Sequence, residues 1–216
     1  MSNSSPRTAQ YRFTFLRHGE SVGNAAGYYQ GQADFELNET GIAQSQALAR
    51  RWLEERVAFD AIITSPLKRA AQTAEIIAQA LKCTPIPDPV WMERNNGKIA
   101  GLTAEEARQQ IPRPGFIHPY QPIGETGESQ WELYLRAGRA VQSLLARPVG
   151  SYMVVSHGGL LNFVMYAILG ITPQANFQGP RFRFRNCSFA TLTYWPDVHV
   201  WRVEGLNDHA HWPDAE

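Results

Sequence analysis

The sequence predicts an α/β protein built as a single-domain three-layer sandwich, with a mostly parallel central sheet, helices on both faces and a C-terminal antiparallel edge hairpin. Two observations carry this prediction. Short apolar, β-branched runs alternate along the chain with longer segments whose apolar residues recur at helical spacing. Polar residues that can take part in catalysis or ligand binding directly follow several of the short runs. This is the expected placement where a parallel sheet carries a site at the carboxyl ends of its strands. A length of 216 residues suits one domain with a substantial core.

Extended segments are expected where the apolar runs are short. Each of the four main runs leads into a polar group or a turn; they are Tyr11–Phe15, Asp60–Thr64, Pro89–Met92 and Tyr152–Ser156. Near the C-terminus, Phe189–Tyr194 and Val198–Val203 flank Trp195-Pro196-Asp197, which is typical of a hairpin at one sheet edge.

Helices are expected where apolar residues recur three and four positions apart. The four stripes run from Ala43 to Leu53, from Ala70 to Leu81, from Leu133 to Leu145 and from Leu160 to Leu169. Asn38 or Thr40 is a suitable cap for the first of them. We find no internal repeat and no domain linker, so residues 11–216 are expected to form one domain behind a flexible tail of residues 1–10.

The charge and the composition limit the binding partners and the cellular compartment that we expect for this protein. The formal net charge is zero and the isoelectric point is about 7, which predicts no broad basic face for nucleic acid or an anionic membrane. Residues 1–10 are polar, unlike a secretory signal, and no apolar run reaches the length of a membrane span. Cys83 and Cys187 form no paired motif, which indicates free thiols and a cytoplasmic location. A homodimer is compatible with this composition.

Five polar groups follow strand ends, where one pocket can bring them together. Arg17 and His18 follow the first strand, Arg69 follows the second at the start of a helix, and His157 follows the strand that ends at Ser156. Glu93 comes after Pro89–Met92. Ligands bind beyond the carboxyl ends of such strands, so the sequence predicts one pocket with two histidines, two arginines and a glutamate. An arginine near a helix N-terminus opposes the helix dipole, which favours a ligand-facing role for Arg69.

The ordered set of motifs resembles the histidine phosphatase superfamily, the phosphoglycerate-mutase-like enzymes. The resemblance covers most of the chain, and its ordered combination is far more specific than any single motif. The motifs are Leu16-Arg17-His18-Gly19-Glu20-Ser21 with Asn24, Gln30-Gly31, Leu37-Asn38-Glu39-Thr40-Gly41, Ser65-Pro66-Leu67-Lys68-Arg69-Ala70 with Gln72-Thr73-Ala74, Glu93, Gly127-Glu128-Ser129, Val155-Ser156-His157-Gly158-Gly159 and Asn186-Cys187-Ser188.

The resemblance implies a role for each matching residue. His18 would accept the phosphoryl group as a phosphohistidine that water then hydrolyses, and Glu93 would protonate the leaving oxygen. The other members would bind the phosphoryl group or line the entrance; they are Arg17, Arg69 and His157, then Asn24 and the backbone of Gly158, then Gln30 and Gly31. His157 would act there as a cation or at least as a hydrogen-bond donor. No metal and no cofactor are implied.

The Pro-rich segment of residues 111–129 occupies the place where this family builds a lid, and it is alternatively a passive surface loop. The lid residues expected to influence substrate choice are Phe116, Ile117, His118, Tyr120 and Ile123. The segment carries few cations, and Asn95 and Asn96 stand where mutases of the family show His and Tyr, so the interpretation favours a metal-independent phosphomonoester hydrolase acting on a small molecule.

Two other functions stay open, a cofactor-dependent phosphoglycerate mutase and a catalytically silent module that binds a phospho-ligand. Other carboxylates also compete with Glu93 for the role of proton donor; they are Glu105, Glu106, Glu125 and Glu128. The remaining histidines are expected to be structural or exposed; they are His118, His199, His209 and His211.

Overall fold

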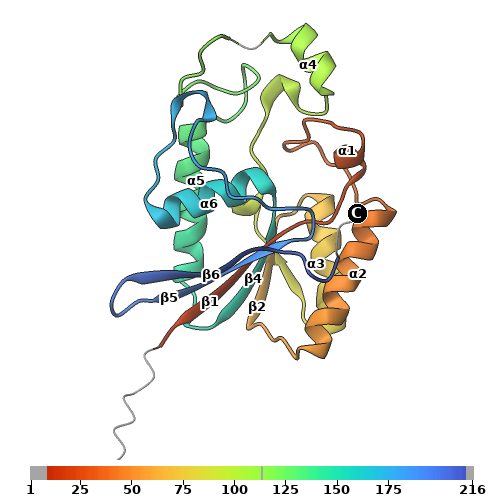
Figure 1. Ribbon diagram of the computed structural model, residues 1–216, viewed down its shortest axis with the longest axis vertical. Helices are drawn as coiled ribbons and strands as arrows, with labels where there is room; N and C mark the ends of the chain where they lie inside the picture. The colour runs from red at the N-terminus through yellow and green to blue at the C-terminus, as the bar shows by residue number, and fades with distance from the viewer. Residues whose placement is uncertain (1–8, 113, 213–216) are drawn as a thin grey trace, which may run out of the picture.

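A sheet of six strands in the order β3-β2-β4-β1-β5-β6 forms the centre of the molecule (Figure 1). The computed structural model describes residues 9–112 and 114–212. The strands are β1 (Tyr11–Arg17), β2 (Ala61–Thr64), β3 (Pro85–Pro87), β4 (Ser151–Ser156), β5 (Phe189–Trp195) and β6 (Val200–Asp208). The first four run parallel, whereas β5 is antiparallel to β1 and β6 is antiparallel to β5. The predicted fold class is confirmed.

Helices cover both faces of this sheet, with α5 and α6 on one side and α2 and α3 on the other (Figure 1). Their bounds are α1 (Val22–Ala25), α2 (Glu39–Glu54), α3 (Lys68–Leu81), α4 (Ala104–Gln110), α5 (Gln130–Leu145) and α6 (Gly158–Leu169), with short 3-10 helices η1 (Pro89–Trp91), η2 (Gly97–Ile99) and η3 (Ala175–Phe177). Of the two caps considered for α2, Asn38 is the one used, because its side chain accepts a hydrogen bond from the Gly41 N–H at 2.8 Å.

The alternation of side chains along β4 divides the apolar core into two layers. Tyr152 and Val154 pack with α5 and α6, whereas Met153 and Val155 pack with α2 and α3. A central parallel strand is buried on both faces, which explains why Tyr152–Ser156 is a continuous apolar run rather than an alternating one. The β-strand period therefore fixes which helix pair each residue contacts.

The prediction of an extended segment at Pro89–Met92 is wrong. Residues 89–91 form η1, and the strand of this region is the preceding β3. The Asp88 side chain accepts a hydrogen bond from the Val90 N–H at 3.0 Å, and Pro89 has no N–H for a ladder, so both residues favour a tight turn. Trp91 is fully buried beneath this turn, and Glu93 follows a turn rather than a strand.

The edge hairpin is present, but its second strand is longer than predicted. β6 continues to Asp208, beyond the expected end at Val203, and its register against β5 shifts twice. Most of β6 is exposed, so its end lacks the apolar alternation that marks an inner strand. Arg51 of α2 anchors that end through two hydrogen bonds to Asp208, at 2.6 and 2.9 Å.

A close approach of two backbones fixes the turn that follows β1. A Cβ atom at Gly41 would collide with the Glu20 carbonyl, and one at Gly19 would lie 2.6 Å from the Gly41 carbonyl oxygen. The Glu20 N–H also donates to Gln44 Oε1 at 2.9 Å. The N-terminal turn of α2 therefore packs directly on the residues after His18, which explains both glycines in the motifs.

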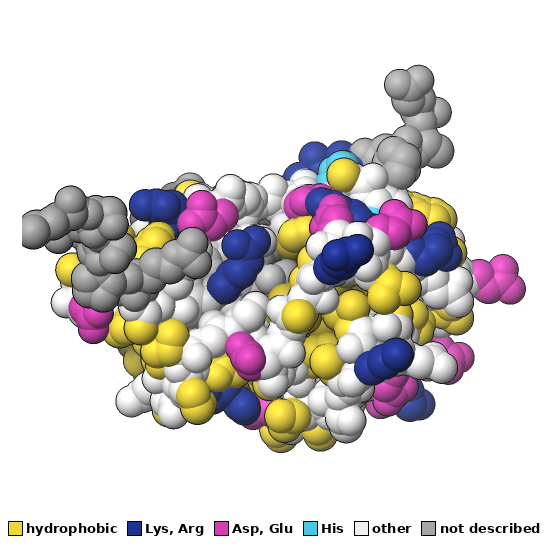
Figure 2. Space-filling model, turned by 90° about the horizontal axis from the view of Figure 1, so that it is seen from below, with side chains coloured by type: hydrophobic (Ala, Val, Ile, Leu, Met, Phe, Trp, Pro, Cys, Tyr) yellow, Lys and Arg dark blue, Asp and Glu magenta, His cyan; other side chains and the backbone are white. Residues whose placement is uncertain are grey.

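No helix of the described residues is long and apolar enough to cross a membrane. The face seen in Figure 2 carries acidic and basic side chains interspersed among hydrophobic ones, with neither sign dominating it. Residues 1–8 of the predicted N-terminal tail lie outside the described part of the chain.

Candidate active site

A cavity of about 850 Å³ opens beyond the carboxyl ends of the parallel strands. The register of β1 against β4 pairs Arg17 with Ser156, so the next residues along the two strands, His18 and His157, are neighbours. The His18 N–H donates to the Ser156 carbonyl at 3.0 Å, and the two imidazole rings lie 5.1 Å apart at 56°. Sheet register alone thus brings together two histidines that are far apart in sequence.

His18 is neutral, and its tautomer is fixed. Its Nδ1 lies 2.6 Å from the Gly19 carbonyl oxygen, which can only accept, so Nδ1 carries the hydrogen and Nε2 carries the lone pair. The side chain is 3% exposed. Burial, reinforced by the positive charges of Arg69 and Arg17, lowers the pKa of His18 well below its usual value of 6.5. The residue thus presents an unprotonated ring nitrogen in a positive field.

Backbone carbonyls, rather than carboxylates, hold the guanidinium groups beside His18. Arg17 Nη1 donates to the Phe184 carbonyl at 2.7 Å, and Arg69 donates to the carbonyls of Gly31 and Ala33 at 2.7 and 2.9 Å. Burial lowers the pKa of Arg69 to about 10 and also lowers that of Arg17, so both stay charged near neutral pH. The buried Nε of each arginine has no hydrogen-bond partner among the described residues.

His157 lies against His18 but does not line the cavity. It is fully buried, its Nε2 is 2.8 Å from Ser65 Oγ, and its Nδ1 has no partner within the described chain. Burial, followed by the charge of Arg69, lowers the pKa of His157 well below 6.5, so the ring is neutral rather than cationic in the free protein. If the Ser65 hydroxyl donates to Nε2, Nδ1–H remains a hydrogen-bond donor.

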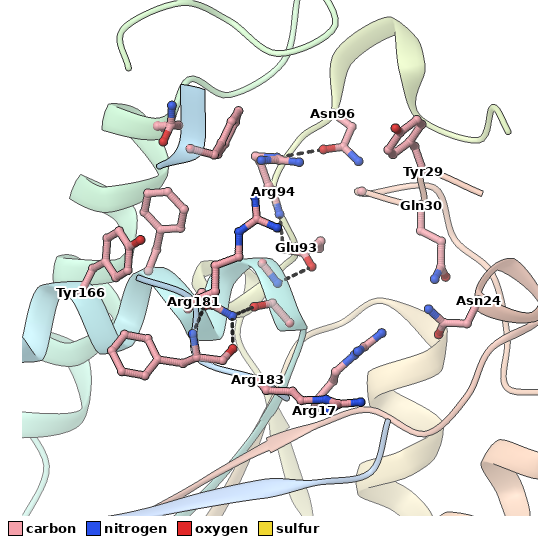
Figure 3. Close-up of a pocket in the computed structure, with 18 of the residues that line it drawn as sticks. Arg17, Asn24, Tyr29, Gln30, Glu93, Arg94, Asn96, Tyr166, Arg181 and Arg183 are labelled. Carbon is pink, nitrogen blue, oxygen red and sulfur yellow. Dashed lines mark hydrogen bonds between the residues drawn. The ribbon is translucent and has the colours of Figure 1, made fainter. Parts of the chain in front are cut away.

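Helix α1 and the loop after it supply amide side chains to one wall of the cavity (Figure 3). Asn24 Oδ1 accepts hydrogen bonds from the Ser21 N–H at 3.2 Å and from Asn186 Nδ2 at 3.1 Å, which leaves its own NH₂ group as the donor available to a ligand. Gln30 Oε1 accepts from Ser21 Oγ at 2.7 Å. Gly31 and Gly158 line the cavity as well.

Glu93 sits on the N-terminal turn of α6. Its Oε2 accepts from the Gly159 N–H at 2.9 Å, while Oε1 accepts from the Leu160 N–H at 2.9 Å and from the Arg94 N–H at 2.8 Å. A Cβ atom at Gly159 would lie 2.5 Å from Oε1, so only glycine leaves room for this contact. Oε2 accepts a single N–H and keeps a lone pair for another proton.

The competing carboxylates lie elsewhere. Among the described residues that line the cavity, Glu93 is the only carboxylate. Glu106 accepts from Thr103 at the start of α4, Glu105 contacts Arg108, Glu125 pairs with Lys98, and Glu128 pairs with Arg136.

Arg136 of α5 positions the backbone that carries Glu93, a function that sequence reasoning did not assign. Its Nη1 donates to the carbonyls of Val90 and Met92 at 2.9 and 2.6 Å, and its Nη2 donates to the Glu93 carbonyl at 3.2 Å. The same guanidinium forms a bidentate pair with Glu128, at 2.6 and 2.7 Å. Arg136 of α5 thus joins η1, Glu93 and Glu128 in one partly buried network.

The outer walls of the cavity come from two irregular segments. The described residues between α4 and α5 form no helix or strand, and of the five predicted lid residues only Ile117 lines the main cavity. Ile123 lines an adjoining cavity of about 430 Å³. Phe116, His118 and Tyr120 line neither of these cavities.

The opposite wall, with Arg181 and Arg183, was not predicted. The only signal for it in the sequence is the alternation Arg181-Phe182-Arg183-Phe184-Arg185. Such an alternation is typical of an extended segment with two different sides.

A nucleophilic imidazole among buried guanidinium groups, at the carboxyl edge of a three-layer α/β sandwich, defines the class of site used for phosphoryl transfer. The sequence profile of the histidine phosphatase superfamily (branch 1) matches residues 13–209, and the chain belongs to this superfamily. Its site therefore supports a phosphatase or mutase activity. The family membership predicted from the motifs is confirmed.

Proteins named as mutases and proteins named as phosphatases both resemble the chain over nearly all of its length. "Probable phosphoglycerate mutase GpmB" of Yersinia pestis is 37% identical over 205 residues, which cover 91% of this chain and 92% of that protein. A mycobacterial glucosyl-3-phosphoglycerate phosphatase in complex with VO₃ is 26% identical, with a TM-score of 0.74 and coverage of 91% and 98%. YhfR of Bacillus stearothermophilus is 27% identical, with a TM-score of 0.76 and coverage of 92% and 98%.

We expect the rings of His18 and His157 to stay neutral from about pH 8 to about pH 6, because burial and the neighbouring arginines oppose their protonation. Imidazole NMR signals, assigned by comparison with His18→Ala and His157→Ala, will measure this. The same protein in denaturant is the control and should titrate near the ordinary histidine pKa of about 6.5. A midpoint at or above that value in the folded protein would contradict the neutral site.

Gly159→Ala is expected to lower kcat by about a hundredfold. The new methyl group would lie 2.5 Å from Glu93 Oε1, so the carboxylate has to move out of its present position. Gly138→Ala on α5 is the matched control, since a Cβ atom there meets nothing within 4 Å and the variant should keep full activity. Thermal unfolding of both variants separates a local effect from a loss of fold. Equal activity of the two would show that the position of Glu93 is unimportant.

Proposed function

We propose that this protein is a metal-independent phosphomonoester hydrolase that acts through a phosphohistidine on His18, with Glu93 as the proton donor. One observation carries the proposal. Around the unprotonated Nε2 of His18, three buried nitrogens have no hydrogen-bond partner in the described chain; they are Arg17 Nε, Arg69 Nε and His157 Nδ1. Buried donors without partners are costly, and a phosphoryl group with its three peripheral oxygens would satisfy them.

In the first step, His18 Nε2 attacks phosphorus, an N–P bond forms, and the P–O bond to the leaving group breaks. The leaving oxygen departs with the proton of Glu93 Oε2 as an alcohol. The guanidinium groups of Arg17 and Arg69, both positive and already held in place, stabilise the negative charge of the peripheral oxygens in the transition state. They provide the positive charge that metal ions provide in many other phosphotransferases.

In the second step, a water molecule takes the place of the alcohol. Glu93 accepts one proton from the water as its oxygen attacks phosphorus, the N–P bond breaks, and inorganic phosphate leaves. The lone pair returns to Nε2, and Glu93 again carries the proton that the next cycle needs. The hydrogen bond from Nδ1 to the Gly19 carbonyl persists through both steps and stabilises the positive charge that the phosphorylated ring carries.

Hydrolysis is favoured over mutase chemistry because a mutase must retain its phosphorylated intermediate and exclude water. The described part of residues 111–129 brings Pro114 and Ile117 to the cavity and adds no cation there. The name of the Yersinia relative keeps a mutase as the second candidate. A silent binding module is disfavoured, since binding alone requires neither a nucleophile with a fixed tautomer nor the carboxylate of Glu93.

Hydrolysis of an aryl phosphate and of a panel of metabolite monoesters in EDTA is expected to proceed, and His18→Ala should lower kcat by at least about a thousandfold. Isomerisation of 3-phosphoglycerate, measured in parallel on the same preparations, tests the second candidate. Isomerisation without phosphate release would replace the proposal with a mutase. Binding of phosphomonoesters with neither reaction would support the silent module.

A further inference from the structure

We propose that Arg181 and Arg183 form a second anion-binding subsite, and that the substrate carries a further anionic group, a carboxylate or a second phosphate, a few bonds from its phosphoryl group. The inference rests on the phosphoryl site proposed at His18, and it specifies the substrate class of that site. Neither arginine belongs to the motifs that carry the family resemblance.

The segment that carries the two arginines is held rigidly at alternate residues. The carbonyls of Pro180, Phe182 and Phe184 accept side-chain hydrogen bonds from Tyr166, Asn162 and Arg17 at 2.6, 2.8 and 2.7 Å. The Phe182 N–H also donates to Asn162 Oδ1 at 2.8 Å. Three anchors with a period of two fix an extended backbone, so the side chains of residues 181 and 183 lie on a common side.

Both arginines line the cavity, and both are exposed within it. Figure 3 shows the Arg181 side chain pointing into the pocket in the direction of Glu93 and Arg94, while Arg183 is drawn next to Arg17. Neither Arg181 nor Arg183 has a hydrogen bond or ion pair with a described residue. The two guanidinium groups are therefore free to bind a ligand without first breaking a contact inside the protein.

The charge of the cavity is strongly unbalanced, although the protein as a whole is neutral. Among the described residues, the lining includes the guanidinium groups of Arg17, Arg69, Arg94, Arg181 and Arg183 against a single carboxylate. That carboxylate, Glu93, already accepts three backbone N–H groups. A phosphoryl group at His18 compensates Arg17 and Arg69, and the outer pair remains available to a second anion.

The position of the subsite limits the size of the substrate. Arg17 contacts the carbonyl of Phe184 directly, so Arg183 is one residue away from the phosphoryl-binding group. Arg181 stands two residues further along an extended chain, which is about 7 Å. An anionic group held there belongs to the same small molecule as the phosphoryl group, and Arg guanidinium groups suit carboxylate and phosphate oxygens equally well.

The test compares substrates that differ only in the second anion. The pairs for a carboxylate are 3-phosphoglycerate with glycerol 3-phosphate, and phosphoserine with phosphoethanolamine; for a phosphate, a sugar bisphosphate is compared with its monophosphate. The ratio of kcat/KM within each pair is measured for the parent protein, for Arg181→Gln/Arg183→Gln, and for the control Arg139→Gln. Arg139 is exposed on α5 and lies outside the cavity.

We expect the parent protein to prefer the member with the second anionic group in at least one pair. The double variant should lower that ratio of kcat/KM by about tenfold or more, because it loses charge-assisted hydrogen bonds. The pair that responds identifies the source of the anion. Arg139→Gln should leave every ratio unchanged. A double variant that leaves the ratio within every pair unchanged would overturn the subsite. If both members then lose activity equally, the arginines act only through a general field effect.

A failure of the proposed reaction is distinguishable from a failure of the subsite. If the parent protein releases no phosphate from any monoester, the reaction is wrong, and calorimetric binding of the same pairs to His18→Ala then decides the subsite by itself. The subsite is supported if the member with the second anionic group binds more tightly and if this difference disappears with Arg181→Gln/Arg183→Gln. Equal binding of the two members overturns it.

Discussion

The rest of this site depends on two guanidinium groups, the buried Arg69 and the half-buried Arg17, which lie beside a neutral imidazole. Burying a charge is costly unless a partner compensates it, and here the partners of Arg17 and Arg69 are backbone carbonyls. Carbonyl oxygens satisfy N–H groups without cancelling the positive charge. Together with burial, which is the larger cause, the positive charge that remains lowers the pKa of His18 and attracts an anion from solution. Had carboxylates held the arginines, the same residues would have formed neutral ion pairs with little affinity for phosphate.

The fold maintains this costly arrangement by fixing its backbone from several directions. The β1–β4 register places His18 next to His157, the N-terminal turn of α2 packs against Gly19 and Glu20, and Thr73 Oγ1 accepts the Gly19 N–H at 3.0 Å. On the far side, Arg136 fixes the chain on which Glu93 stands. His18 and Glu93, the proposed nucleophile and proton donor, thus sit on separate supports. Such preorganisation reduces the reorganisation that the reaction requires.

Much of the fold and of the inner site could be predicted, because both depend on local pattern. Strand ends place His18, Arg69 and His157 at one edge, and glycine motifs mark where backbones meet. The η1 turn was missed since a proline-led apolar run looks the same whether it is extended or turned. Ser65 and Arg136 act through contacts with distant segments, and nothing in their immediate sequence reveals those partners. The phosphoryl roles proposed for these residues rest on the family and on the geometry together.

The most direct test of the account is rapid quenching of the protein during turnover of a labelled phosphomonoester, followed by mass spectrometry of the labelled peptide under conditions that preserve phosphohistidine. The account predicts an acid-labile phosphoryl group on Nε2 of His18, because the lone pair is on that nitrogen and Nδ1 is held by the Gly19 carbonyl. Label on another residue, or burst kinetics with no labelled His18, would contradict it.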